Sequence, residues 1–183
     1  MSRIAKKPIK VSDKIKVVLV PDNDGYLFKV AGPLGENSRV FKKDIKIEIN
    51  NDGIKLSPTR VDSLAQKALW GTYASHIKNM IEGVTDGFKK VLQIEGIGYK
   101  TQVAGTKMVW SLGFSHTIDV EIPKGLKVTV EKNMVSITGT DKEVVGQFAA
   151  QLVSMKPPEP YKGKGIRYEG QVVRIKEGKK SVT

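Results

Sequence analysis

Apolar and polar residues alternate on both sides of a turn in the stretch Ile45-Lys46-Ile47-Glu48-Ile49-Asn50-Asn51-Asp52-Gly53-Ile54-Lys55-Leu56. Such alternation is typical of half-buried strands, and Asp-Gly in the connection favours a hairpin. Alternate residues of a strand point to the same face, so the apolar positions of both arms share one side of this hairpin. That side has to be covered by a second layer, which the residues that follow must provide.

A helix is predicted directly after this hairpin. Ser57-Pro58 predicts its start, because proline suits a first turn, and Gly83 predicts its end. His76 falls on the apolar side and is expected to be a satisfied core or edge histidine rather than a metal ligand. The apolar side repeats at spacings of three and four residues and forms one continuous face, made of Val61, Leu64, Ala65, Ala68, Leu69, Thr72, Tyr73, His76, Ile77, Met80 and Ile81.

The same order of hairpin and helix recurs later in the chain. The arms at residues 126–130 and 135–137 resemble the first hairpin, and Thr140 and Glu143 are placed as the capping box of a second helix, which Pro157 ends. Its apolar face is Val144, Val145, Phe148, Ala149 and Leu152. Further strands are predicted at 15–20, 26–30, 89–94, 99–103, 108–112 and 117–122.

These elements predict an α+β fold with two tandem domains of similar fold, each a mostly antiparallel sheet with one helix packed on it. We place the boundary at the glycine-rich junction 83–87, which gives an N-terminal α+β domain at 1–82 with a basic arm and a C-terminal α+β domain at 83–183 with a basic tail. The alternative is that hairpin-then-helix is a common unit that occurs twice without duplication, and the sequence leaves it open.

Charge is concentrated at the two ends of the chain. The formal net charge is +12 over 183 residues, yet residues 17–155 are almost neutral. Residues 1–16 carry six Lys or Arg against Asp13, and residues 156–183 carry eight against three Glu. Basic ends on a neutral body predict a polyanionic partner, nucleic acid before membrane. A solubilising tail is the plainer alternative.

Several other classes of protein lack support. The chain has no cysteine, which excludes disulfides and thiolate chemistry and fits a reducing compartment, and we expect no secretory signal, because no apolar run follows Arg3, Lys6 and Lys7. The two histidines, His76 and His116, are far apart in the sequence. Gly96-Ile97-Gly98 lacks the third glycine of a dinucleotide fingerprint and is interpreted as a strand bend or bulge. We therefore predict no catalytic residue, metal site or cofactor, and no small-molecule substrate.

The most informative segment is Pro157-Pro158-Glu159-Pro160-Tyr161-Lys162-Gly163-Lys164-Gly165-Ile166-Arg167-Tyr168. Its prolines favour an extended beginning, and its glycines would let the backbone approach a surface closely. Lysine and arginine supply positive charge, and the two tyrosines supply planes for stacking. We interpret the segment as a loop that lies on a phosphate backbone.

Residues 158–166 of this segment resemble the signature of the L6 family of bacterial large-subunit ribosomal proteins. Short matches in family order run through nearly the whole chain, and one departure is Ala74-Ser75, where the family usually has Arg-Ala. The matching stretches include Ser2–Ile9, Gly32-Pro33, Gly71-Thr72, Asn79-Met80, Gly83-Val84-Thr85, Gly87-Phe88, Gly96 to Tyr99, Leu112-Gly113-Phe114-Ser115-His116, Gly139 to Lys142 and Val145-Gly146-Gln147.

The resemblance implies a non-enzymatic protein of the cytoplasmic ribosome. It implies binding to 23S rRNA, mainly through the C-terminal domain and close to the sarcin–ricin loop, near the base of the acidic stalk and the factor-binding region, with other large-subunit proteins as neighbours. The candidate rRNA-binding residues are Arg3, Lys6, Lys7, Lys156, Tyr161, Lys162, Gly163, Lys164, Gly165, Arg167, Tyr168, Arg174, Lys176, Lys179 and Lys180.

Two rival functions remain at this point. A free-standing nucleic-acid binder, such as a nucleoid or RNA-chaperone protein, would explain the basic ends but not the ordered run of motifs. A small hydrolase would need a cluster of base and nucleophile that the sequence lacks.

Overall fold

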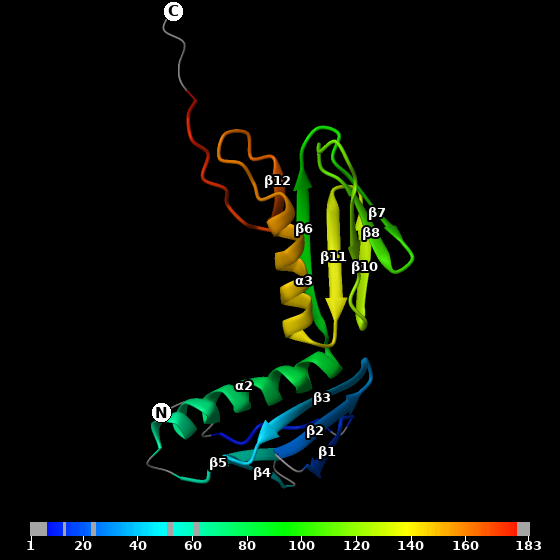
Figure 1. The fold of residues 1–183 in the computed structure, drawn as a ribbon. Coiled ribbons are helices and arrows are strands. Elements are labelled where there is room, and N and C mark those ends of the chain that lie inside the picture. Colours follow the sequence, from blue (N-terminus) through cyan, green and yellow to red (C-terminus); the bar gives the residue numbers. More distant parts are fainter. Residues whose placement is uncertain (1–6, 13, 23–24, 51–52, 61–62, 179–183) are drawn as a thin grey trace, which may run out of the picture. The chain divides into compact units, whose positions relative to one another are not determined.

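Two compact units make up the chain in the structure, which is a computed structural model that describes residues 7–12, 14–22, 25–50, 53–60 and 63–178. One unit consists of the described residues up to Phe88 together with Thr140–Lys142, and the other of Lys89–Gly139 with the described residues from Glu143 onward. Each unit pairs antiparallel strands with one long helix (Figure 1). The predicted α+β class with one helix on each sheet assembly is thereby confirmed.

The first unit contains a three-stranded sheet and a hairpin. The sheet has the order β1 (Lys16–Pro21), β2 (Gly25–Gly32) and β3 (Gly35–Lys42), and the hairpin joins β4 (Ile45–Asn50) to β5 (Gly53–Pro58). Ile49 pairs with Ile54 and Ile45 with Pro58, so the hairpin extends two residues beyond the predicted end of its second arm. Ile9 forms a bridge to Ile54, which attaches the described residues that precede β1 to β5.

The helix of this unit, α2 (Leu64–Thr85), starts and ends later than the sequence suggested. Ser57-Pro58 belongs to β5, and the cap is Ser63, whose side chain accepts a hydrogen bond from the Gln66 N–H. The helix continues through Gly83 to Thr85. The predicted start was wrong because a hydroxyl cap satisfies a free N–H at the helix start, whereas Pro58 is already paired in the hairpin.

Among the described positions of the predicted apolar face only the second half is deeply buried, and Val61 lies outside the described residues. The buried positions run from Ala74 to Val84, whereas Leu64 is 82% exposed and Ala65, Ala68 and Thr72 are exposed. Three partly buried residues of the first half pack against the core, namely Leu69, Trp70 and Tyr73. The Trp70 indole donates a hydrogen bond to the Leu56 carbonyl at 2.9 Å. His76 is half-buried and hydrogen-bonded to Arg39 at 3.0 Å, in agreement with a satisfied core or edge histidine.

The second unit contains seven strands and one helix within its described residues. A four-stranded sheet has the order β10 (Leu126–Glu131), β11 (Met134–Gly139), β6 (Phe88–Glu95) and β12 (Gly165–Tyr168). A three-stranded sheet contains β7 (Lys100–Ala104), β8 (Lys107–Ser111) and β9 (Ile118–Glu121). Helix α3 (Lys142–Met155) runs alongside β6 and β11 (Figure 1) and buries Val145, Phe148, Ala149 and Leu152.

Two strands were not predicted. β3 is polar in sequence, Gly-Glu-Asn-Ser-Arg-Val-Phe-Lys, yet it pairs with β2 along its whole length. β12 lies within the segment that was interpreted as a loop. Gly96-Ile97-Gly98, interpreted as a strand bend or bulge, forms a bend and turn directly after β6 that lead to β7.

Candidate nucleic-acid interface

The segment interpreted as one basic loop is a loop followed by an edge strand. Residues 157–164 form the loop, which is closed by a hydrogen bond from the Glu159 N–H to the Lys164 carbonyl at 2.9 Å and one from the Gly163 N–H to the Glu159 carbonyl at 3.1 Å. The remainder is β12, whose Ile166 pairs with Ile94 of β6. The base of the loop is held because the Ile166 N–H donates to the Lys156 carbonyl at 2.8 Å. The segment was predicted to be a loop through Tyr168, and this prediction was wrong for its last third, which forms β12.

Arg167 lies on β12 and has a protein partner. Its guanidinium donates to the Glu95 carboxylate, and the same carboxylate oxygen accepts from the Gln93 amide at 3.1 Å. Only 23% of the Arg167 side chain is exposed. Arg167 thus ties the strand after the loop to β6, and its charge is balanced within this unit. A phosphate contact by Arg167 stays a prediction.

The two glycines are buried and have roles inside the protein. Gly165 has φ +145°, and a Cβ at this position would lie 2.6 Å from the Pro157 carbonyl oxygen. Gly163 has φ +71°, in the left-handed region that glycine adopts without strain. We expected these glycines to bring the backbone close to a ligand. The close approach that Gly165 makes is to the chain's own Pro157-Pro158, which folds the loop back on its first residues.

The outer surface of the loop carries free charge and an aromatic ring. Lys162 is exposed, Tyr161 is 59% exposed, and Lys164 is half-buried. After the turn at 169–170, the described residues 171–178 have no regular secondary structure, and the Lys176 N–H donates to the Pro160 carbonyl at 2.7 Å. This bond brings the exposed Lys176 to the loop, so two basic segments that are separate in sequence form one surface. Arg174, two residues earlier, is exposed as well.

Two further candidate residues, Lys156 and Tyr168, take part in contacts between a cation and an aromatic ring. The Lys156 ammonium lies 4.7 Å from the centroid of the Phe114 ring, and the Lys90 ammonium lies 5.8 Å from that of Tyr168. Both distances are within the range of cation–π attraction. Tyr168 is half-buried, so it offers less of its ring than Tyr161 does.

The remaining candidates lie in the other unit or outside the described residues. Lys7 is exposed but belongs to the other unit. Arg3, Lys6, Lys179 and Lys180 lie outside the described residues. Sequence reasoning missed Glu95, Lys90 and Phe114 altogether. The aromatic residue in Gly113-Phe114-Ser115-His116 was the one signal in the sequence that could have pointed to Phe114, which the structure shows to be exposed. Glu95 could not be found in this way, because the cross-strand pairing of β6 with β12 has no local signature.

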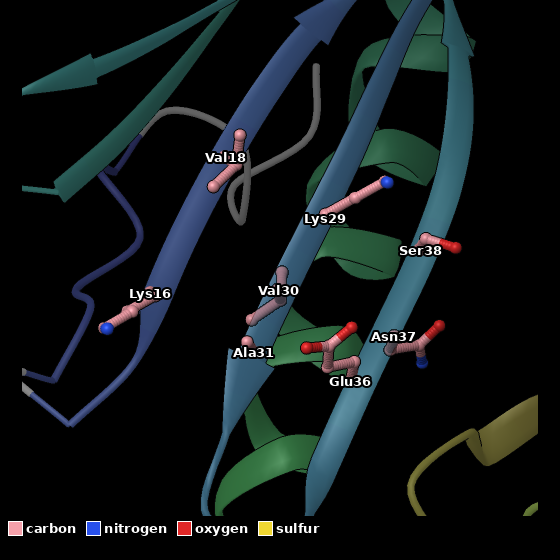
Figure 2. Close-up of a pocket in the computed structure, with 8 residues that line it drawn as sticks. All are labelled: Lys16, Val18, Lys29, Val30, Ala31, Glu36, Asn37 and Ser38. Atoms are coloured by element: carbon pink, nitrogen blue, oxygen red, sulfur yellow. The ribbon is translucent and has the colours of Figure 1, made fainter.

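A shallow hollow lies on the open face of the first unit's sheet (Figure 2). The side chains around it come from three adjacent strands, and Lys16, Lys29 and Glu36 are its charged members. Its lining has no paired carboxylates, histidine or other nucleophile–base arrangement of the kind that catalysis requires. The other lining residues are Val18, Val30, Ala31, Asn37 and Ser38.

Metal and membrane functions gain no support from the described part of the chain. Among those residues, no three His, Cys, Asp or Glu side chains are grouped so that they could hold a metal ion. Neither described helix combines the length and the apolar character that crossing a bilayer requires. What the arrangement offers chemically is a fixed positive surface with exposed rings, which is suited to binding a polyanion.

This fold and its positive surface would suit a structural protein that binds a polyanion, and comparisons with known proteins narrow this broad class to one family. The sequence profile of ribosomal protein L6 matches residues 8–87 and 95–169. Large ribosomal subunit protein uL6 of Thermosipho africanus is 44% identical over 188 residues, with 99% of this chain and 100% of that protein covered. The uL6 of Dictyoglomus thermophilum is 45% identical over 181 residues, and uL6c of Guillardia theta 44% over 180, each with 98% of both chains covered.

The chain belongs to the ribosomal protein L6 family. Its members are structural ribosomal proteins and not enzymes, so the resemblance seen in the sequence and the prediction of a non-enzymatic ribosomal protein are both confirmed. The first matched segment lies in the first unit and the second lies mostly in the second unit, and each contains antiparallel strands and one helix.

Proposed function

We propose that this protein is the uL6 component of the large subunit of a cytoplasmic ribosome and that it binds 23S rRNA through its second unit. The full-length similarity to proteins named as large ribosomal subunit proteins supports the first part. The resemblance of residues 158–166 to the family signature supports the second. The same resemblance points to the region near the sarcin–ricin loop, at the base of the acidic stalk, with neighbouring large-subunit proteins as further partners.

The observation that carries the proposal is the backbone hydrogen bond from the Lys176 N–H to the Pro160 carbonyl. It joins the loop that bears Lys162 and Lys164 to the basic segment that follows β12. Lysine acts on phosphate as a compact point charge, and phosphate contacts position a protein on RNA rather than read its sequence. A surface of this kind suits one folded rRNA site held by several backbone phosphates.

We assign to the ion pair of Arg167 with Glu95 a role in ordering this surface. It adds a side-chain link to the backbone pairing of β12 with β6, and the hydrogen bonds that close residues 159–164 join the loop to the start of that strand. A loop that is ordered before binding loses less conformational entropy when it meets RNA. The role we assign to Arg167 is therefore to position the loop.

Co-sedimentation on sucrose gradients tests the proposal. The wild-type chain should migrate with large subunits in high salt, whereas the double variant Lys162→Ala/Lys164→Ala should dissociate at a lower salt concentration. Mass spectrometry of ultraviolet-crosslinked subunits should then find rRNA attached to peptides that contain residues 156–176. A wild-type chain that binds RNA fragments but never migrates with subunits would favour the free-standing nucleic-acid binder.

A further inference from the structure

An exposed aromatic group borders the basic loop and has no part in the function described so far. Phe114 is 42% exposed and lies just after β8, in the segment of residues 112–116. Leu112 before it is fully buried, and Gly113 has φ +76°. The left-handed glycine turns the chain sharply after the buried anchor, so that Phe114 projects from the core.

Tyr99 packs against the turn that presents Phe114. A Cβ at Gly113 would lie 3.2 Å from the Tyr99 ring, which shows how closely the tyrosine packs against this turn. The same ring would lie 2.4 Å from a Cβ on Gly96. Tyr99 therefore fills the space between two glycine turns, and the backbone around Phe114 is held by packing.

A second ring and a cation accompany Phe114. The His116 ring is exposed and nearly parallel to it, with an interplanar angle of 21° and centroids 6.2 Å apart. The Lys156 ammonium lies 4.7 Å from the Phe114 centroid. Because the Lys156 carbonyl accepts the Ile166 N–H at the base of the loop, this cluster and the basic loop share one anchor.

We propose that Phe114 and His116 form a stacking platform for an unpaired RNA base and that Lys156 contacts a phosphate beside that base. This inference rests on the proposed binding of rRNA and adds a base-contacting site to it. Proteins recognise unstacked bases on aromatic planes, including those of phenylalanine and histidine, and a neighbouring cation meets the backbone. Exposed rings next to a basic loop supply both parts, whereas the lysines of the loop supply only charge.

The site predicts a preference for unpaired RNA. A fully paired helix presents no free base face, because its bases are stacked within the duplex. The platform should therefore add affinity only for RNA with a loop or bulge. The basic loop should bind both kinds of RNA through phosphate.

Equilibrium binding of the full chain to two RNAs tests this proposal. The first is a 23S rRNA fragment with the loop-containing region near the sarcin–ricin loop, and the second is a fully paired RNA of equal length. Phe114→Leu keeps an apolar side chain and removes the aromatic plane, so it should weaken binding to the fragment about tenfold and leave the duplex unchanged. Phe114→Tyr should restore the loss. Val103→Ala, which shortens another partly exposed side chain of this unit, is the control and should change neither affinity.

Salt titration separates the platform from the cation. Phe114→Leu should leave the slope of log K against log salt unchanged, because stacking releases no counterions, whereas Lys156→Met should flatten it by about 0.7 to 0.9. If Phe114→Leu binds the fragment as wild type does, or loses affinity equally for both RNAs, the platform does not exist. If the wild-type chain binds neither RNA in a salt-dependent way, the proposed rRNA function fails before this inference is reached.

Discussion

Gly165 shows how a single residue sets the shape of the loop. Its φ is +145°, and a Cβ added to it would lie only 2.6 Å from the Pro157 oxygen, so there is no room for a side chain. Gly165→Ala should therefore destabilise the second unit by about 2 kcal/mol or more through strain and collision. Thermal unfolding measures this loss of stability. Gly146→Ala is the matched control: it lies in α3 with open space around it, and it should stabilise the protein by about 0.5 to 1 kcal/mol. Equal effects of the two substitutions would contradict this account of Gly165.

Met80 carries the corresponding prediction for the first unit. It is 4% exposed and lies on the buried part of α2, so Met80→Asp places an unpaired charge in the core. The cost is several kcal/mol, enough to unfold this unit. Circular dichroism with thermal melting measures it. Ala68→Asp, at an exposed position of the same helix, should leave the fold intact. A Met80→Asp chain that melts like wild type would show that α2 does not form the core.

At the scale of elements, local sequence patterns predicted most of the strands and the second helix. Hairpins such as β4–β5 carry their own signals, namely alternation and a turn with Asp-Gly. β3 and β12 could not be found in this way. β3 has few apolar residues and buries only Phe41, so it lacks an alternating pattern, and β12 becomes a strand only by pairing with β6, whose residues lie more than 60 positions away in the chain.

The sequence pointed to the charged and aromatic residues of the candidate site, and their contact with rRNA stays a prediction, whereas the contacts that hold these residues in place were missed. Lys162 and Tyr161 are exposed and Lys164 is half-buried, which leaves charge and a ring at the surface as a binding loop requires. Composition could not reveal that Arg167 is paired with Glu95, because that contact depends on the register of two distant strands. Phe114 remained unassigned for the same reason: its proximity to Lys156 is a tertiary contact.

The link between β12 and β6 makes a prediction about the loop. Arg167→Met removes the charged hydrogen bond to Glu95 while keeping much of the side-chain volume, so β12 should loosen by about 1 to 3 kcal/mol. The amides of Ile166 and Gly163, which are bonded in the structure, should exchange faster with deuterium. Arg174→Met, at an exposed position, should leave their exchange unchanged. Unchanged protection in Arg167→Met would mean that the ion pair does not order the loop.

At the scale of the whole molecule, the two units should be separable. Every strand pairing among the described residues joins strands of the same unit. A fragment of residues 83–183 contains the whole second unit and should fold alone with most of the rRNA affinity of the full chain. Dispersed amide resonances in NMR and binding to the 23S fragment measure this. Disorder of the isolated fragment would show that the division predicted at residues 83–87 is not a folding boundary.

We expect the loop and its tethered basic segment to bind rRNA phosphates, and the salt dependence of binding reveals such contacts. Log K for the 23S rRNA fragment is measured against log salt for the wild-type chain, for Lys162→Ala/Lys164→Ala, and for the control Lys46→Ala/Lys55→Ala. The control removes two exposed lysines from the β4–β5 hairpin of the first unit. If each loop lysine neutralises one phosphate, the loop variant should bind more weakly, with a slope flatter by about 1.4 to 1.8, while the control keeps the wild-type slope. A wild-type slope in the loop variant together with a flattened slope in the control would contradict the account and place the RNA-binding surface on the first unit.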